Sequence, residues 1–310
     1  MADFANEASL AHPFAARGAA VHVLHGIPSR MPLEALSAAD ARGDHGPFPE
    51  ISLNDVRARR WASMGQQAPG ARVDLLLWGD SHAMALIPVL EPLCREYAID
   101  GAAITNSANA PLLDFVTLEP LGLKGEATAF ARAVVEVVEK ERIHDVILAA
   151  LWSRYLPRQD LKPGDTPEGS YREALLKTVR ALQQAGARVW IVNEVPTYPI
   201  NVPLALARTR MFGTPQHEVE LPRSIYNERI KGTSSAFDAA AALGARILEP
   251  ADHLPGTALR FAGVGSGRPL YRDSNHLSTF GALHLRPLFQ RIFLSLPEAM
   301  LRNPPLDTNH

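Results

Sequence analysis

The sequence is poor in the features that mark several classes of protein. Of its 310 residues only Cys94 is a cysteine, which excludes an intramolecular disulfide and a cysteine-based metal site. Its 31 Lys and Arg residues against 33 Asp and Glu residues give a formal net charge of -2, so no basic excess points to nucleic acid. The longest apolar runs, such as 146–152, are far too short to cross a bilayer. What remains is an ordinary globular protein with 46% hydrophobic residues.

The amino-terminal part of the chain has a different character from the rest. The first residues, MADFANEASLAHPF, contain no basic region followed by an apolar one, so we expect no signal peptide here. Residues 1–70 are rich in Ala, Pro and Gly, with one short helix predicted in LNDVRARRWASMG. We expect an N-terminal extension, 1–70, packed on a main domain, 71–310. The sequence is equally compatible with a piece of a longer exported or membrane-tethered protein.

From residue 72 onward, short apolar runs alternate with amphipathic segments. The runs predict about five strands, at 73–78, 101–105, 145–151, 188–194 and 246–248. The segments between them predict helices at 84–97, 126–142, 171–185, 225–243 and 279–294, the last kinked at Pro287. We interpret the proline-rich stretch 196–222 as an irregular insertion. This order predicts an α/β fold of three layers, with a doubly wound, flavodoxin-like parallel sheet that binds ligands at the carboxyl ends of its strands.

Polar residues follow the first of these strands directly. The run 74–78, DLLLW, stops at Gly79, and Asp80, Ser81 and His82 come next. Gly79 allows a sharp turn, which puts Ser81 at the start of a helix, where backbone N–H groups favour negative charge. Ser81 is then a candidate nucleophile with its own N–H as an oxyanion donor, and Asp80 can accept backbone hydrogen bonds that fix the turn. A helix cap made by Asp80 or Ser81 is the other interpretation, and the tetrapeptide alone does not decide.

A second polar group precedes the last predicted helix. In YRDSNHLSTFG, Asp273 and His276 are three residues apart, and Ser278 has the position of a helix N-cap. In a turn, that spacing lets the carboxylate hold the imidazole in the tautomer that accepts a proton from a hydroxyl group. Asp-x-x-His is frequent in solvated loops, and the motif gains weight here from its pairing with Gly-Asp-Ser-His. A further acid–His pair, Asp252 and His253, is a weaker candidate.

These two motifs resemble the first and last motifs of the SGNH hydrolase superfamily, also called GDSL-like esterases. The resemblance covers roughly residues 72–295. It implies a catalytic triad with Ser81 as nucleophile, His276 as general base and acid, and Asp273 as the orienting carboxylate. It also implies that the chain is an enzyme that uses neither a cofactor nor a metal ion.

Three longer segments give a narrower resemblance. LLLWGDSHAMALIPVL, VILAALWSRY and LYRDSNHLSTFGALHL are similar to the SGNH domain that follows the membrane domain of bacterial glycan O-acyltransferases. The resemblance implies an extracytoplasmic, periplasmic-side location and a membrane acyltransferase domain to which this chain is fused or tethered. It further implies a glycan acceptor and an acyl donor as partners, and no nucleic acid.

The chain departs from the superfamily at the oxyanion donors. The third predicted strand ends in LWSRY, without the Asn of the usual Gly-x-Asn-Asp motif, and the second motif reads NSANAPL, with Asn109 where relatives have a cysteine. The candidates for oxyanion or substrate contacts are therefore Asp80, the Ser81 N–H, the backbone of Ser107–Asn109, the Asn109 side chain, and Trp152. For Trp152 a place at the acceptor sugar and a buried position at the strand end are both open.

The sequence leaves several functions open. The leading one is serine-dependent O-acyl transfer, an acetyl group in particular, to a bacterial surface or cell-wall glycan. A carbohydrate or small-ester O-acetylesterase is the close alternative, because water then replaces the sugar hydroxyl. A non-catalytic glycan-binding module is a third. Gly-Asp-x-His also occurs in dinuclear metallophosphatases, but the upstream Asp-x-His and downstream Gly-Asn-His motifs that those sites need are missing here.

Overall fold

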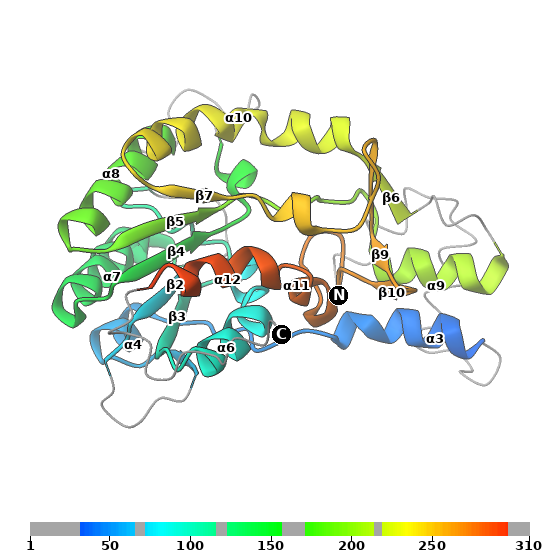
Figure 1. Ribbon diagram of the computed structural model, residues 1–310, viewed down its shortest axis with the longest axis horizontal. Helices are drawn as coiled ribbons and strands as arrows, with labels where there is room; N and C mark the ends of the chain where they lie inside the picture. The colour runs from blue at the N-terminus through cyan, green and yellow to red at the C-terminus, as the bar shows by residue number, and fades with distance from the viewer. Residues whose placement is uncertain (1–31, 66–71, 116–122, 157–170, 214–218, 297–310) are drawn as a thin grey trace, which may run out of the picture. The chain divides into compact units, whose positions relative to one another are not determined.

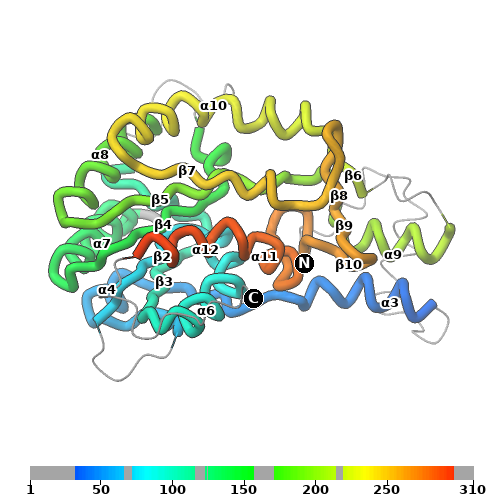
Figure 2. Tube along the Cα trace, viewed as in Figure 1, coloured from blue at the N-terminus to red at the C-terminus, as the bar shows by residue number. Residues whose placement is uncertain are grey.

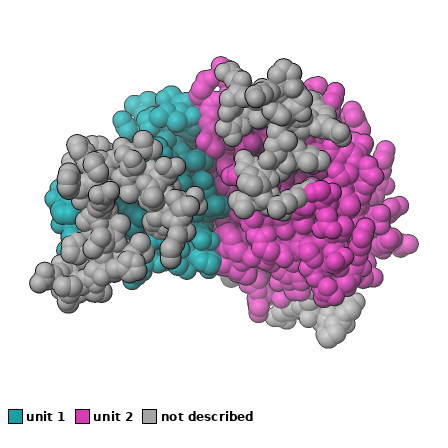
Figure 3. Space-filling model, turned by 180° about the vertical axis from the view of Figure 1, so that it is seen from behind, with its two compact units in different colours: residues 1–45, 196–226, 254–281 teal, residues 46–195, 227–253, 282–310 magenta. Residues whose placement is uncertain are grey.

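The computed structural model of the protein describes residues 32–65, 72–115, 123–156, 171–213 and 219–296. The chain forms two compact units, each assembled from separate stretches of sequence and coloured separately in Figure 3. Unit 1 comprises residues 1–45, 196–226 and 254–281, and unit 2 comprises residues 46–195, 227–253 and 282–310. Of the expected N-terminal extension, residues 32–45 thus belong to unit 1 and residues 46–65 to unit 2. A functional boundary near residue 70 stays a prediction.

Unit 2 contains a six-stranded sheet with the strand order β1-β3-β2-β4-β5-β7 (Figure 1). Its strands are β1 Ala62–Met64, β2 Leu75–Gly79, β3 Gly101–Thr105, β4 Asp145–Ala149, β5 Arg188–Val192 and β7 Arg246–Leu248. β1 pairs antiparallel with β3, and every other neighbouring pair is parallel. All residues of β2, β3 and β4 are buried, as expected for apolar runs in a sheet covered on both faces. The mainly parallel α/β sheet with its five predicted strands is confirmed.

Helices cover both faces of this sheet. The unit holds α4 Leu53–Arg57, α5 Ser81–Met84, α6 Ile87–Glu96, α7 Ala127–Glu141, α8 Tyr171–Gln184, α12 Arg286–Leu294, the short helices η3 Lys124–Glu126, η4 Trp152–Tyr155 and η6 Pro250–His253, and most of α10 Arg223–Ala242. Trp78 and Leu148 pack with Phe130 of α7 and Val179 of α8 in one core. α6 and α12 lie together at the opposite face, where Tyr97 and Phe293 stack with ring centroids 5.3 Å apart (Figure 2).

Two stretches differ from the sequence-based expectation. The predicted helix in LNDVRARRWASMG ends early: α4 stops at Arg57, Arg59 has a left-handed φ of 57°, and residues 62–64 become the edge strand β1. Pairing with β3 outweighs local helix propensity there. The stretch 196–222 is not irregular throughout, since it contains α9 Val202–Phe212. Pro203 lies in the first turn of that helix, where a missing N–H costs nothing.

Unit 1 is the smaller of the two units. It contains α3 Leu33–Asp40 packed against α9, the short helix η2 Ala41–Gly43, the antiparallel pair β6 Glu220–Pro222 and β8 Arg260–Ala262, and the hairpin β9 Val264–Gly265 and β10 Arg268–Pro269. Tyr198 and Tyr271 form a T-shaped pair with centroids 5.0 Å apart. The predicted last helix is broken into α11 Thr279–Leu283 and α12, and Pro287 lies in the first turn of α12. Among all described residues, no helix is long and apolar enough to span a membrane.

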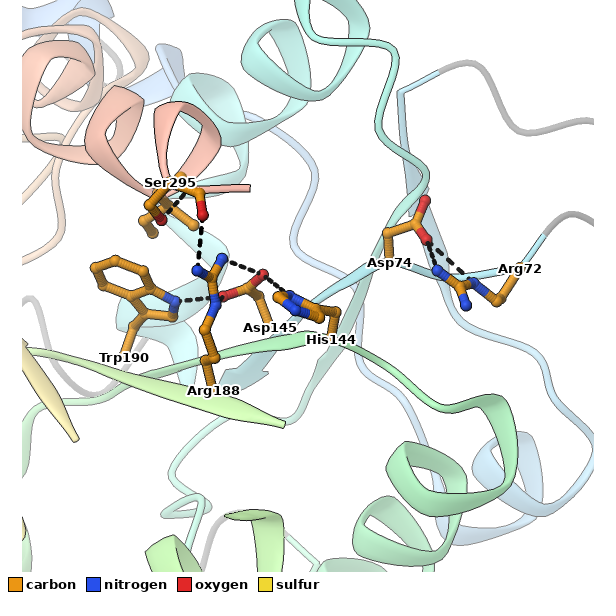
Figure 4. A network of polar contacts seen from close by, with 8 residues as sticks. Arg72, Asp74, His144, Asp145, Arg188, Trp190 and Ser295 are labelled. Carbon is orange, nitrogen blue, oxygen red and sulfur yellow. Dashed lines mark hydrogen bonds and ion pairs between the residues drawn. The ribbon is translucent and has the colours of Figure 1, made fainter. Parts of the chain in front are cut away.

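A buried charge network fixes the amino end of β4 (Figure 4). Asp145 is fully buried and accepts hydrogen bonds from Arg188 Nε and Nη2, both at 2.9 Å, and from Trp190 Nε1 at 2.6 Å. His144 Nδ1 lies 2.7 Å from Oδ2 of the same Asp145 carboxylate. Arg188 Nη1 also donates to the carbonyl of Ser295 at 2.7 Å, which joins the end of α12 to the sheet. This network lies at the end of the sheet opposite to the one where parallel strands place their ligands.

Candidate active site

The turn after β2 requires glycine. Gly79 is paired in register with Thr105 of β3 and Ala149 of β4. A Cβ atom at Gly79 would lie 1.7 Å from the carbonyl oxygen of Ala149 and 2.8 Å from the Cβ of Ala83. No side chain therefore fits between these neighbouring strands, and the sharp turn that follows places Ser81 at the first position of α5.

Asp80 is the cap of α5 and an anchor of the turn. Its side chain is buried, with the residue only 2% exposed. Oδ1 accepts a hydrogen bond from the His82 N–H at 2.8 Å, and Oδ2 accepts from the Leu151 N–H at 3.1 Å and the Tyr155 hydroxyl at 2.8 Å. The sequence left open whether the polar turn was a cap or a nucleophile site. Asp80 supplies the cap, which leaves Ser81 one position further on, at the helix start.

The segment after β4 forms the short helix η4, and a second buried carboxylate holds it. Glu194 follows β5, and its side chain is fully buried. The Ser153 N–H donates to Glu194 Oε1, the Ser153 hydroxyl donates to Oε2 at 3.0 Å, and Arg229 Nε lies 3.4 Å from Oε2. Burial raises the pKa of Glu194, and the contacts with Ser153 and Arg229 offset only part of this effect. Glu194 was not among the predicted site residues, although an acidic residue at the end of an apolar run was a usable signal.

Trp152 belongs to the core. It is fully buried, its Nε1 donates to the carbonyl of Val192 at 2.7 Å, and its ring makes T-shaped contacts with Tyr171 and Phe237. Two positions were open for Trp152, and the full burial of its ring leaves neither face accessible for stacking on an acceptor sugar. The alternative reading, a buried aromatic that closes the strand end, fits.

The loop after β3 begins beside the Gly79 turn. The Asn106 N–H donates to the Gly79 carbonyl at 3.1 Å. The Ser107 N–H donates to the Glu50 carboxylate at 2.9 Å, and the Ser107 hydroxyl binds the same carboxylate, so this backbone donor is already engaged. Asn109 is buried, and its N–H donates to the carbonyl of Asn106 at 3.2 Å. The Ser107 and Asn109 N–H groups are thus engaged within the protein, and the Asn109 side chain stays a candidate oxyanion donor.

The predicted Asp–His pair exists in unit 1. Asp273 Oδ2 lies 2.7 Å from His276 Nδ1, and Oδ1 accepts from the N–H groups of Asn275 at 2.8 Å and His276 at 2.7 Å. Burial raises the pKa of Asp273, but the hydrogen bonds and the charge interaction with His276 outweigh it and lower the pKa to about 2. The carboxylate is therefore ionised at neutral pH and holds the imidazole by Nδ1.

The loop that carries this pair is closed at both ends. Tyr271 and Leu277 form an antiparallel bridge, and the Arg272 N–H donates to the His276 carbonyl at 3.0 Å. Ser278 caps the following helix as predicted, because its hydroxyl accepts from the Gly281 N–H at 3.0 Å. Asp80 and Ser81 belong to unit 2, whereas Asp273 and His276 belong to unit 1. The joining of both halves into one triad stays a prediction.

The weaker acid–His pair, Asp252 and His253, lies in the short helix η6. The single cysteine, Cys94, is buried in α6, and burial raises the pKa of its thiol and keeps it protonated. Within the described ranges, no group of three or more His, Cys, Asp or Glu side chains is arranged to hold a metal ion.

Comparison with known proteins gives a family match and structural neighbours. The sequence model of the SGNH domain (fused to AT3 domains) matches residues 61–291. The periplasmic domain of a lipopolysaccharide acetyltransferase from Salmonella ser. Paratyphi A superposes with a TM-score of 0.56 at 17% identity, covering 79% of this chain and 90% of that one. TesA superposes with a TM-score of 0.40 at 13% identity, covering 71% and 97%. No curated protein sequence matches the chain.

Proposed function

The chain belongs to the family of SGNH domains that are fused to AT3 domains, and on that premise we propose that it transfers an acyl group, an acetyl group in particular, to a hydroxyl of a bacterial surface or cell-wall glycan. The transfer passes through an ester on Ser81. The observation that carries the proposal is the Ser81 turn: a glycine-only strand end and a buried, fully engaged Asp80 hold a serine at the start of a helix, at the carboxyl edge of the sheet.

In the first half-reaction, Ser81 Oγ attacks the carbonyl carbon of the acyl donor and gives its proton to His276 Nε2. Asp273, bound at Nδ1, stabilises the resulting imidazolium because its lowered pKa keeps it ionised. The tetrahedral intermediate then expels the donor's leaving group, which takes the proton from His276. The product of this half-reaction is acyl-Ser81.

In the second half-reaction, a sugar hydroxyl gives its proton to His276 and attacks the acyl-Ser81 carbonyl. The ester bond to Ser81 breaks, and Oγ recovers the proton from His276. Water in place of the sugar makes the same sequence an esterase, which is the alternative function. The choice between the two depends on how well the acceptor site excludes water.

The oxyanion of both intermediates needs hydrogen-bond donors near Ser81. The Ser81 N–H at the start of α5 is one candidate, and the Asn109 side chain, from the loop that begins beside Gly79, is the other. The Ser107 N–H is not among them, because it donates to Glu50.

The family also supports a location and a partner. Fusion of these domains to AT3 domains supports a membrane acyltransferase domain that delivers the acyl group to this chain. The Salmonella neighbour is described as the periplasmic domain of a lipopolysaccharide acetyltransferase, which supports an extracytoplasmic location and a glycan acceptor. We expect no cofactor and no nucleic-acid partner.

A fluorophosphonate probe tests the serine mechanism directly. We expect covalent labelling of Ser81, read by mass spectrometry of the peptide that contains it, and no labelling of Ser81→Ala. Overnight treatment with EDTA should leave the labelling unchanged, since the proposed serine mechanism uses no metal ion. A wild-type protein that is folded and not labelled at Ser81 would refute the serine mechanism and favour the alternative of a glycan-binding module. Addition of acceptor oligosaccharides to an acetyl-ester assay, with analysis for acetylated sugar, separates the transferase from the esterase.

A further inference from the structure

Two buried carboxylates hold the helix η4 from different strands of the same sheet edge. Asp80, after β2, binds the Leu151 N–H and the Tyr155 hydroxyl, at the two ends of the segment. Glu194, after β5, binds the N–H and the hydroxyl of Ser153, in its middle. The segment 151–155 therefore connects the two carboxylates, and any shift of it changes the donors that face Asp80.

Holding the helix η4 with the buried carboxylate of Glu194 is costly in free energy. Its side chain is fully buried, and Arg229, the cation at 3.4 Å, is itself 37% exposed. A buried carboxylate carries a desolvation penalty, and an apolar side chain of similar size often gives a more stable protein. Packing alone thus does not account for an acidic residue here. What Glu194 provides that an apolar residue cannot is a pair of acceptor oxygens aimed at one residue of η4.

We infer that Glu194 is a positioning residue for the reaction proposed above: it fixes η4, η4 supplies the donors that orient Asp80, and Asp80 sets the turn that presents Ser81. This role rests on the proposed function. This role differs from that of the triad and of the oxyanion donors, since Glu194 binds Ser153 of η4 and acts on Ser81 through η4 and Asp80.

The test measures the rate constant for labelling of Ser81 by a fluorophosphonate, together with the melting temperature. We expect Glu194→Ala to lower the rate constant at least about tenfold, because a small displacement of a reactive group costs much in rate. Glu194→Gln should recover the rate to within about threefold of wild type, since its amide oxygen can still accept from the Ser153 N–H. A residue that only stabilised the fold would change the melting temperature without this pattern in the rate.

Asp145→Asn is the matched control. Asp145 is also a buried carboxylate with several hydrogen bonds, but it lies at the amino end of β4 (Figure 4). This variant should lower the melting temperature while the labelling rate of the folded protein stays within about twofold of wild type, a change of less than 0.5 kcal/mol in barrier. An equal loss of rate in Asp145→Asn would show that general destabilisation slows labelling, and would overturn the inference.

A double-mutant cycle with Tyr155→Phe tests the route through η4. Because both changes loosen the same segment, the double variant should lose less rate than the product of the two single losses. Simple multiplication of the losses, or a wild-type rate in Glu194→Ala, would overturn the inference. If Glu194→Ala does not fold, Ser153→Ala takes its place in the cycle. A wild-type protein without labelling at Ser81 refutes the proposed function itself, whereas a labelled wild type with a normal Glu194→Ala rate refutes only the positioning role.

Discussion

Replacement of Asp80 by Asn, which hardly changes the size of the side chain, tests whether Asp80 holds the turn that carries Ser81, the proposed nucleophile. In the native structure one carboxylate oxygen faces the His82 N–H, and the other faces the Leu151 N–H and the Tyr155 hydroxyl. An amide has only one acceptor oxygen, so in either orientation its NH2 group faces a buried donor. A buried donor left without a partner costs about 1–3 kcal/mol, and where the NH2 faces His82 that donor is the N–H of the helix cap itself, so the loss of the cap is the same contribution.

We therefore expect Asp80→Asn to lower the free energy of unfolding by about 1–3 kcal/mol. Urea denaturation followed by circular dichroism measures this difference, and fluorophosphonate labelling of Ser81 in the folded variant measures the effect on the nucleophile. Tyr155→Phe is the graded control, because it removes only one of the donors and should cost about 1 kcal/mol. A loss below about 0.5 kcal/mol in Asp80→Asn, with labelling at the wild-type rate, would refute the view that Asp80 holds the turn.

The other predictions concern the strand end, the acid–base pair and the oxyanion. Gly79→Ala should cost at least about 3 kcal/mol in urea denaturation, because its Cβ would overlap the Ala149 carbonyl at 1.7 Å; a smaller loss would mean that β2 and β4 separate easily there. The pKa of Asp273 is lowered to about 2, so its pairing with His276 stabilises the fold above the unfolded pKa of 3.8, and this contribution disappears as the pH falls from about 4 to about 2. Asp273→Asn should therefore flatten the pH dependence of stability in that range. If the stability of the variant fell as steeply with acid as that of the wild type, the stabilising pairing of Asp273 with His276 would be contradicted. Asn109→Ala should lower acetyl-ester turnover about a hundred- to a thousandfold with little change in melting temperature. A loss of less than about threefold would assign Asn109 to the loop's architecture and leave the oxyanion to backbone N–H groups.

The parallel core of the fold was predictable because its strands are continuous apolar runs. β2 to β5 are close to the predicted positions, since a strand buried on both faces leaves a strong local pattern. The edge strand β1 was missed because its three residues carry no such pattern and depend on pairing with β3. The helix α9 was missed for a different reason: the prolines of the stretch 196–222 were interpreted as helix breakers, although Pro203 lies where proline favours a helix start.

The site was predictable to the extent that its residues are close in sequence. Asp273 and His276 form the expected contact because three residues and a turn bring them together. Asp80 and Ser81 could be placed at a strand end, but the partners of Asp80 come from Leu151 and Tyr155, which only the sheet brings close.

Long-range packing also determines the positions and partners of two other side chains. Trp152 lies in the core because its Nε1 donates to the carbonyl of Val192 and its ring packs against neighbouring aromatic rings. A tryptophan at a strand end does not reveal these contacts in the sequence. The hydrogen bond partner of Glu194 could not be predicted either, since Ser153 is 41 residues away in the chain, although the acidic residue at the end of an apolar run was itself a signal.

The central claim is that Ser81 carries the acyl group, and a rapid-quench experiment with a chromogenic acetyl ester tests it most directly. Acid quenching within the first turnover, followed by mass spectrometry of the peptide that contains Ser81, reveals any acyl-enzyme. The account predicts an acetyl group on Ser81 in the wild-type protein, much slower acetylation in His276→Ala, and none in Ser81→Ala. Turnover of the ester by a Ser81→Ala variant at a rate close to wild type, or an acetyl group on another residue in its place, would contradict the account.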